Sequence, residues 1–497
     1  MGSIARSASE SFDVMIVGAG LSGINSAYRI QTELPGYSYT VLESRDAIGG
    51  TWDLFRYPGI RSDSDLHTFG FPWRPWTEHR AIAAGEAIRN YIRESAEEFG
   101  IDKKIRFGNK MLSADWSTEE QNWNMLVDSN GEEKLYKARF IIFSTGYYDY
   151  NEPLKTTIPG IENFKGTRIH PQFWPEDLIV DSKKIVIIGS GATAVTLLPI
   201  LAQTAKHVTM LQRSPTYILS RPSVDPVGTF LRKVFPSWIA SRIVRYRFLV
   251  LPFLFSKFCS AFPEAARRII HKRVKAELPP SMSIDPDFNP RYNPWEQRLC
   301  VCPDGDFYES LRNGSSDVVT DTIERVTETG IETVGGKVID ADIIITATGL
   351  KMQLAGGATL SRDGTPLSLP STFAWNSTML SDVPNAALVI GYANASWTLG
   401  ADAAAKLVIR LLKYMRKNGF SSAMPRVGDV GMKKQNLLNL NSTYVEKAKG
   451  DLPSAGDKKP WLPRSNYFVD LWAASYGNLT RGLEFTSAAD AASKKVN

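Results

Sequence analysis

The stretch that decides the fold reads Phe12-Asp13-Val14-Met15-Ile16-Val17-Gly18-Ala19-Gly20-Leu21-Ser22-Gly23. Its apolar half is typical of a buried parallel strand, and its glycine-rich half is typical of a tight turn that leads into a helix. Glycines at such a turn let the backbone approach a pyrophosphate, and the N-terminus of the next helix stabilises its negative charge. The stretch therefore predicts a dinucleotide-binding unit.

A second stretch has the same form. The apolar run Ile185-Val186-Ile187-Ile188 leads directly into Gly189-Ser190-Gly191-Ala192-Thr193-Ala194. One glycine motif is weak evidence, but two in the same strand–turn–helix context are strong evidence against the alternative of ordinary tight turns. We therefore predict an α/β fold with two Rossmann-like dinucleotide-binding domains.

The residues that follow each motif distinguish the two nucleotides. Glu43 ends the apolar run of residues 39–42, where a carboxylate accepts hydrogen bonds from ribose hydroxyls and repels a 2′-phosphate. After the second motif, the run of residues 207–211 is followed by Gln212, Arg213 and Ser214. A guanidinium in that place suits a 2′-phosphate. The sequence therefore predicts FAD at the first motif and NADPH at the second.

Composition sets the broad class of the protein. A length of 497 residues favours two or three domains, and a net charge of +6 does not by itself indicate a nucleic-acid partner. The three cysteines, Cys259, Cys300 and Cys302, support neither a disulfide framework nor a metal site. They also lie too far along the chain to give a disulfide reductase its redox pair near the first motif.

No signal peptide is visible in the polar residues 1–10, so we expect a cytoplasmic protein. No feature of the sequence specifies an oligomeric state.

Further patterns indicate how the chain is organised. Residues 85–99 are typical of a helix that stops at Gly100, and residues 123–143 of a hairpin that turns at Asn130 and Gly131. Two apolar runs end in similar Thr-Gly turns, at residues 144–147 and 341–349, and we expect the chain to cross between domains there. The expected domains are FAD-binding at 1–150 and 350–497, and NADPH-binding at 151–222 and 299–349.

Residues 223–298 interrupt the NADPH domain as a predicted helical insertion. From Arg232 to Lys275 there are eleven Lys or Arg and one acid, Glu264, and apolar runs interrupt the charges. The longest uncharged apolar run, residues 248–256, is too short to span a bilayer. Two interpretations remain open: a solvated basic face, and a peripheral contact of residues 223–275 with an anionic membrane.

Near the C-terminus, a helical pattern runs to Lys417 and stops at Gly419. Leu407, Leu411 and Met415 mark its packed face. Two interpretations of this helix stay open: Thr398 caps it and its positive end points at the flavin, or it is an ordinary core helix with the expected cap at Thr398 playing no such role.

One linker makes a resemblance specific. Residues 164–175 read Phe-Lys-Gly-Thr-Arg-Ile-His-Pro-Gln-Phe-Trp-Pro, which matches FxGxxxHxxxWP, the fingerprint of Baeyer–Villiger monooxygenases. Related flavin-containing monooxygenases have a similar string without the ending, so Trp174 and Pro175 favour the Baeyer–Villiger branch. Residues 49–52, 56–63 and 291–298 also resemble the ethionamide-activating type of this family, and the likeness covers nearly the whole chain.

The resemblance implies a reaction and a set of residues. NADPH reduces FAD, O2 adds to give a C4a-peroxyflavin, and the peroxide converts a ketone to an ester or lactone. Arg298 matches the family's fixed cation and Asp63 its carboxylate partner beside the flavin, whereas His170 is expected to couple the domains. Gln297 stands where several members place a lysine near the 2′-phosphate, so Arg213 would carry more of the preference for NADPH.

The predicted site therefore has two parts. The predicted catalytic residues are Arg298 and Asp63. The residues predicted to hold FAD are Gly18, Gly20, Ser22, Gly23, Glu43, Gly50, Thr51, Trp52, Asp53, Asp63 and Met111. Those predicted to hold NADPH are Gly189, Ser190, Gly191, Ala192, Thr193, Ala194, Arg213 and Ser214.

Three functions are compatible with these residues. The first is a Baeyer–Villiger monooxygenase that takes O2 and a small-molecule ketone. The second is a flavin monooxygenase that mainly oxygenates sulfur or nitrogen, with a thioether as a typical substrate. The third is a non-catalytic flavin-binding protein, which the intact cofactor motifs and the match at Arg298 disfavour.

Overall fold

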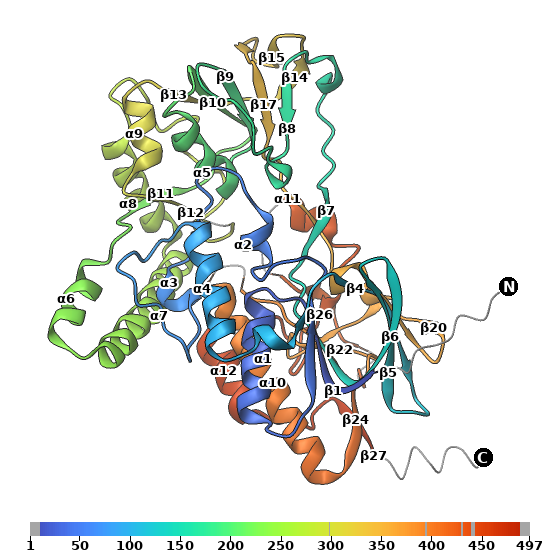
Figure 1. Ribbon diagram of the computed structural model, residues 1–497. Coiled ribbons are helices and arrows are strands. Elements are labelled where there is room, and N and C mark those ends of the chain that lie inside the picture. Colours follow the sequence, from blue (N-terminus) through green and yellow to red (C-terminus); the bar gives the residue numbers. More distant parts are fainter. Residues whose placement is uncertain (1–9, 298, 393–394, 429–430, 439–442, 488–497) are drawn as a thin grey trace.

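The computed structural model describes residues 10–297, 299–392, 395–428, 431–438 and 443–487, and two β-sheets organise these residues (Figure 1). The larger sheet has the strand order β20-β19-β4-β5-β6-β1-β2-β3, and β21, β22 and β23 extend it beside β6. Its strands are β1 (Glu10–Val17), β2 (Tyr39–Leu42), β3 (Ile105–Arg106), β4 (Asn109–Ser117), β5 (Asn122–Ser129), β6 (Glu132–Phe143), β19 (Thr359–Arg362), β20 (Thr365–Pro366), β21 (Ala374–Trp375), β22 (Met379–Leu380) and β23 (Ala386–Leu388).

The second sheet is entirely parallel, in the order β13-β10-β9-β17-β8. Its strands are β8 (Thr167–Ile169), β9 (Lys184–Ile188), β10 (His207–Gln212), β13 (Ser316–Thr320) and β17 (Ile343–Thr346). Each sheet contains one of the glycine motifs, after β1 and after β9, so the predicted α/β fold with two Rossmann-like units is confirmed.

Four strand pairs, one three-stranded sheet (β14-β15-β16) and twelve α-helices lie in the described part of the chain outside these two sheets. The strands are β7 (Tyr148–Pro153), β11 (Ile218–Arg221), β12 (Cys300–Pro303), β14 (Ile323–Val326), β15 (Gly330–Thr333), β16 (Val338–Asp340), β18 (Leu350–Met352), β24 (Phe420–Pro425), β25 (Gln435–Asn436), β26 (Ser454–Ala455) and β27 (Leu483–Ser487). The helices are α1 (Leu21–Glu33), α2 (Thr51–Leu54), α3 (Leu66–Phe69), α4 (Gly85–Glu98), α5 (Ala192–Leu201), α6 (Pro226–Val234), α7 (Ser237–Ala261), α8 (Pro263–Glu277), α9 (Asp306–Arg312), α10 (Trp397–Asn418), α11 (Thr443–Ala448) and α12 (Tyr467–Tyr476).

Strand β1 is buried on both faces because the larger sheet lies between two cores. Val14 and Ile16 pack into the core that contains α1 and α10, whereas Met15 and Val17 face the core formed with β4, β5 and β6. A strand covered on both sides is a continuous apolar run, which explains why residues 14–17 lack any polar alternation.

The chain passes between the two sheets twice, and the two passages lie side by side. It leaves the larger sheet after β6 through β7 and returns from β17 through β18. Strands β7 and β18 pair antiparallel to each other, with Leu350 opposite Pro153. The two connections therefore form a double-stranded link between the sheets.

The local patterns read from the sequence are largely confirmed. Helix α4 ends beside Gly100, which has φ +65°, and β5 and β6 pair through a turn in which Asn130 and Gly131 both have positive φ. Helix α10 ends at Gly419 in the left-handed conformation, with its Leu407 and Leu411 face buried.

The expected cap of helix α10 is wrong. The residue at the N-cap is Ser396, and Thr398 lies inside the first turn, fully buried. The Thr398 hydroxyl donates to the carbonyl of Phe69 at the end of α3. Burial against a neighbouring backbone carbonyl thus takes the hydroxyl away from the helix end.

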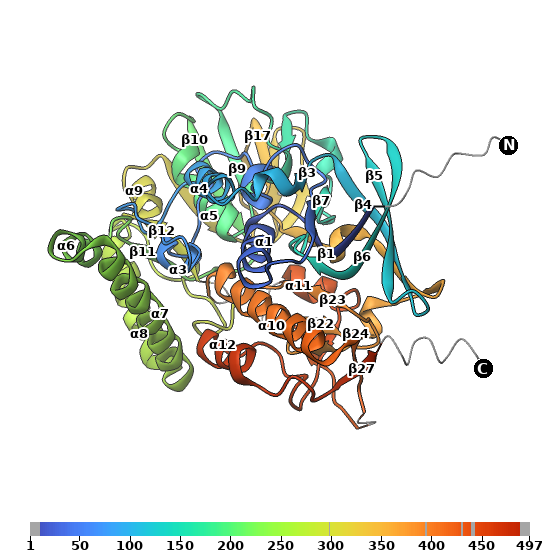
Figure 2. The same ribbon diagram turned by 60° about the horizontal axis from the view of Figure 1, so that its bottom comes forward.

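The predicted helical insertion consists of α6, α7 and α8, which project from the body of the molecule (Figures 1 and 2). In the described residues no single helix has the length and apolarity to cross a membrane. Helices α7 and α8, which are bent by 116° relative to each other, are long and apolar enough when they are counted together, by length and composition alone.

A buried amide offers a test of this packing. Asn385 is 1% exposed, and its side chain donates to the carbonyls of Arg139 and Ser421 and accepts from the Ala423 amide. It thereby joins β6 to β24. Asn385→Ala leaves these groups buried and unpaired, so we expect a loss of about 3 kcal/mol in the free energy of unfolding.

The measurement is a thermal denaturation scan against Asn124→Ala. The side-chain amide of Asn124 donates to the exposed Glu120 carboxylate, so the loss of this side chain should leave the midpoint within about 1 °C of the parent. Equal midpoints for the two variants would contradict the role assigned to Asn385.

Candidate functional site

One large cavity of about 1380 Å³ lies between the two glycine turns. Its walls come from both sheets, from the helical insertion and from the C-terminal helices α10 and α12. Cavities that hold a single drug-sized ligand measure roughly 300–1,000 Å³, so this one has room for more than one small molecule.

The first glycine turn leaves no space for side chains. Gly18 has φ +102°, and a Cβ there would lie 2.7 Å from the carbonyl oxygen of Ser144. A Cβ at Gly23 would lie 1.8 Å from the Gly18 carbonyl oxygen. Gly20 precedes α1 and faces Gly50, so bare backbone borders the cavity at the start of the helix. This surface fits a pyrophosphate such as that of FAD.

Glu43 sits beside this turn as the sequence predicts. Its side chain is buried, and one carboxylate oxygen accepts from the Ala19 amide at 2.7 Å while the other accepts from the Arg45 amide at 2.9 Å. The residue lines the cavity. A fixed carboxylate suits ribose hydroxyls and repels a 2′-phosphate, which fits FAD at this position.

The second glycine turn is built in the same way but faces a cation. Gly189 has φ +133°, α5 begins after Gly191, and Ser190 donates to the Ser214 carbonyl at 2.9 Å. Arg213 lines the cavity with its side chain exposed, and no acidic residue in the described part of the chain forms an ion pair with it. A guanidinium available beside a helix N-terminus fits the 2′-phosphate of NADPH.

Most of the predicted residues meet in this cavity. The predicted residues that line it are Gly18, Gly20, Ser22, Glu43, Gly50, Thr51, Trp52, Asp63, Met111, Gly189, Ser190, Gly191, Ala192, Thr193, Arg213 and Ser214. Gly23, Asp53 and Ala194 do not line it. Arg298 lies outside the described residues, although its neighbours Gln297 and Leu299 both line the cavity.

Asp53 has a different set of partners from the other predicted FAD contacts. Its buried carboxylate pairs with Arg45 at 2.6 Å, with Arg56 at 2.8 Å and with Arg89 at 3.7 Å. These three cations hold α2 against its surroundings, so the geometry gives Asp53 a structural role beside the cavity.

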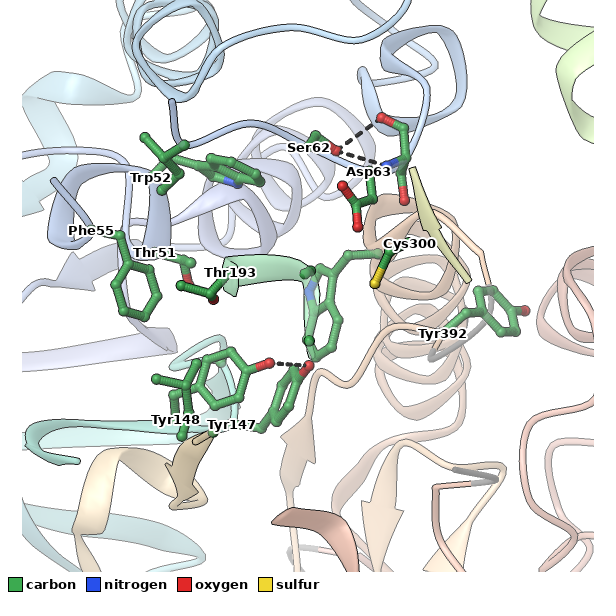
Figure 3. Close-up of a pocket in the computed structure, with 18 of the residues that line it drawn as sticks. Thr51, Trp52, Phe55, Ser62, Asp63, Tyr147, Tyr148, Thr193, Cys300 and Tyr392 are labelled. Carbon is green, nitrogen blue, oxygen red and sulfur yellow. Dashed lines mark hydrogen bonds between the residues drawn. The ribbon is translucent and has the colours of Figure 1, made fainter. Parts of the chain in front are cut away.

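Asp63 points into the cavity from the loop of residues 61–65 (Figure 3). Within this loop the Ser62 hydroxyl donates to the Ser64 carbonyl at 2.9 Å. The buried Arg61 side chain reaches across to Asp306 at the start of α9, at 2.8 Å. The loop that presents Asp63 is therefore fixed to helix α9, which packs on α5 after the second motif.

Two aromatic features of the site were not identified from the sequence. The Trp397 indole stacks on Tyr147 with a centroid distance of 4.9 Å, and its Nε1 donates to the Ser22 hydroxyl.

The second feature is Tyr57, which is hydrogen-bonded to Thr193, and burial raises the pKa of Tyr57 to about 12. Since Tyr57 follows the first motif and Thr193 opens α5, this bond joins the two nucleotide sites.

A carboxyl and a guanidinium, those of Asp65 and Arg221, also line the cavity. Burial raises the pKa of Asp65 to about 6, against the hydrogen bonds from Thr68 and the weaker effect of nearby arginine charges, Arg221 among them. Burial also lowers the pKa of Arg221, which lines the cavity. Because an arginine stays protonated at neutral pH, Arg221 gives this wall a positive charge.

His170 also lines the cavity, in the linker fingerprint. Its Nδ1 accepts from the Gln172 amide at 3.2 Å, and the Gln172 side chain donates to the carbonyl of Asp149 in β7. Burial lowers the pKa of His170. A neutral imidazole tied to the link between the sheets suits a structural coupling role better than that of a general base.

Comparison with known proteins gives one family and close relatives. Residues 12–246 match the family described as flavin-binding monooxygenase-like. The FAD-containing monooxygenase EthA of Mycolicibacterium smegmatis is 47% identical over 96% of this chain and 97% of its own length. The probable FAD-binding monooxygenase AlmA of Acinetobacter baylyi is 42% identical over 97% and 98%.

Solved structures share the fold. An oxidised steroid monooxygenase bound to NADP superposes with a TM-score of 0.76 at 20% identity, over 96% of this chain and 100% of that one. Cyclohexanone monooxygenase with bound ε-caprolactone superposes with a TM-score of 0.73 at 20% identity and the same coverage.

The contact at Gly18 predicts a loss of cofactor. In Gly18→Ala the new methyl group collides with the Ser144 carbonyl, so the turn must shift, and we expect purified protein to retain less than a tenth of its flavin, read from the visible absorbance relative to protein. Gly36→Ala is the matched control, because Gly36 also has positive φ but no atom lies within 4 Å of its added Cβ. Full flavin content in Gly18→Ala would refute this reading of the turn.

Proposed function

The chain belongs to the flavin-binding monooxygenase-like family, and on this premise we propose that it is a Baeyer–Villiger monooxygenase that converts a ketone to an ester or lactone. It is an NADPH-dependent FAD monooxygenase that acts on a small-molecule substrate with O2. The proposed balance is ketone, O2, NADPH and a proton giving ester, water and NADP⁺.

Bound FAD, reduced by NADPH, supplies the electrons and activates the O2 from which one oxygen atom is transferred. The chain would hold it at the glycines of the first turn and at Glu43, and hold NADPH at the second turn and Arg213. The domain boundaries expected from the sequence are part of this proposal: residues 1–150 and 350–497 for FAD, and 151–222 and 299–349 for NADPH.

The observation that carries the ketone reaction is the linker fingerprint. The ending Trp174-Pro175 is the part that separates the Baeyer–Villiger branch from related flavin monooxygenases. Three residues of the same fingerprint, His170, Pro171 and Gln172, line the cavity between the two turns. The fingerprint is thus placed where it can influence both nucleotides.

We assign the catalytic charges to Arg298 and Asp63. A guanidinium is permanently protonated and donates several hydrogen bonds from a rigid plane, so it can stabilise the oxyanion that forms when a carbonyl carbon is attacked. Two observations support this assignment: Gln297 and Leu299 line the cavity on either side of Arg298, and Asp63 points into the same cavity.

The surrounding aromatic residues would keep the reaction dry. The Tyr57–Thr193 bond and the Trp397–Tyr147 stack both line the cavity and place aromatic rings along its wall. Excluding water strengthens every charge interaction inside the cavity and limits the loss of activated oxygen as hydrogen peroxide.

The test of the reaction class is product analysis with a ketone and a thioether of similar size. We expect the ester from the ketone at a rate that matches NADPH consumption. A sulfoxide as the sole product would favour the second function, in which the enzyme oxygenates sulfur or nitrogen. Hydrogen peroxide as the sole product from both substrates would contradict either reaction.

Removing the cation should uncouple reduction from oxygenation. In Arg298→Met we expect ester formation to fall by about 10² to 10³, because one oxyanion donor is lost. Bleaching of the flavin by NADPH should continue. The control is Arg291→Met, an exposed arginine of the same stretch, which should keep its ester yield. An unchanged yield in Arg298→Met would remove the central assignment.

Arg213 should set the preference for NADPH. In Arg213→Ala we expect the KM for NADPH to rise at least about tenfold with little change for NADH, because only the 2′-phosphate loses a partner. Lys206→Ala removes an exposed cation just before β10, at the opposite end of that strand, and serves as the control. Equal effects on the two nucleotides would contradict the assignment.

A further inference from the structure

An unusual apolar surface surrounds the projecting helices. We define the apolar platform as the aromatic side chains of α6, α7, α12 and the α7–α8 bend that are at least 60% exposed. They are Phe230, Trp238, Tyr246, Phe262, Trp472 and Tyr476. Leu251 and Leu254 of α7 are also exposed. Four of these aromatic side chains belong to the projecting helices α6 and α7 and the bend after α7, and two belong to α12. So many large, exposed aromatic side chains mark an interaction surface rather than ordinary surface composition.

The helices α6, α7 and α8 also carry positive charge. The exposed cations of the insertion are Lys233, Arg242, Lys257, Arg268, Lys272, Arg273 and Lys275. Between residues 232 and 275, Glu264 is the single acid. An apolar surface flanked by Lys and Arg, with aromatic residues of Trp and Tyr type, is complementary to a bilayer that carries anionic headgroups.

The same helices form a wall of the cavity. Seven residues of α7 line it: Phe248, Leu249, Pro252, Phe253, Ser256, Lys257 and Ser260. On α12, Tyr467 and Phe468 line it as well. Lys257, Ser260 and Phe468 are themselves exposed, so the cavity reaches the molecular surface between α7 and α12.

An aromatic contact lies at this opening. The rings of Phe253 and Phe468 meet edge to face with a centroid distance of 5.6 Å, and the Lys257 ammonium lies 5.7 Å from the Phe253 ring centroid. Two phenyl rings from different helices can part without breaking a hydrogen bond. The opening is therefore apolar with a cation beside it, and it lies between two of the helices that carry the platform.

We propose that the platform docks this protein on an anionic phospholipid membrane and turns the cavity opening toward the lipid. The helices lie in the interface and do not cross it, since α7 carries Arg242, Arg245, Arg247 and Lys257 along its length. An apolar substrate dissolved in the bilayer then enters between α7 and α12. The identity of that substrate as a long-chain ketone rests on the proposed function.

The docking is tested with the purified holoenzyme and sedimented vesicles. We expect binding to phosphatidylcholine vesicles that contain phosphatidylglycerol, and at least tenfold weaker binding to phosphatidylcholine alone or at high salt. Trp238→Ser/Phe262→Ser should weaken binding at least tenfold. Val334→Ser/Val338→Ser is the matched control, because these side chains are equally exposed but flank the turn between β15 and β16.

Three outcomes would overturn the docking proposal. They are no sedimentation with anionic vesicles, equal sedimentation of the platform and control variants, and protein that stays bound through an alkaline carbonate wash. The last outcome would mean that α7 and α8 insert across the bilayer. Flavin absorbance of each variant shows that the fold is intact.

Activity separates this proposal from the reaction itself. With a long-chain methyl ketone in anionic vesicles, we expect the platform variant to show a KM at least fivefold higher than the control variant. With a short water-soluble ketone, the two variants should be equal. Equal KM values for the long-chain ketone would refute entry from the lipid. Vesicle binding without turnover of any ketone would refute the proposed reaction and leave the docking surface standing.

Discussion

The whole arrangement depends on one backbone contact that occurs twice. The first glycine of each motif packs against a carbonyl of the segment through which the chain passes between the sheets: Gly18 against Ser144, and Gly189 against Ala347. A Cβ would lie within 2.7 Å of the oxygen in both places. Because the nucleotide turns and the connections share this contact, neither can shift alone, and the cavity is fixed between them.

Contacts between distant parts of the chain then give the cavity its shape. The Arg61–Asp306 ion pair and the Tyr57–Thr193 hydrogen bond connect residues 57–61 to the helices α9 and α5 beside the second sheet. The β7–β18 pair links the same two parts of the molecule, although its residues are far from these contacts in the sequence. A site assembled in this way can hold two nucleotides in a fixed relation, which hydride transfer requires.

The sequence predicted what depends on neighbouring residues and missed what depends on packing. The two glycine turns, the hairpin turn at Asn130 and the stop at Gly419 follow from local conformation, and each was found. Thr398 was misassigned because burial against α3 overrides capping, and nothing in the local pattern shows which element packs there. The Trp397–Tyr147 stack was missed for the same reason: its partners are 250 positions apart in a chain read without contacts.

The cavity has two chemically different ends, and this division explains the insertion. At one end Arg213 and the helix N-terminus of α5 suit a polyanionic nucleotide. At the other, α7 and α12 present phenyl rings and a surface that water solvates poorly. A monooxygenase must exchange a charged cofactor with water yet admit an apolar substrate to a dry interior. An apolar opening between α7 and α12, away from Arg213, would meet the second demand. Exposed aromatic side chains on those helices are unfavourable in water, and an apolar phase that covers them removes this cost.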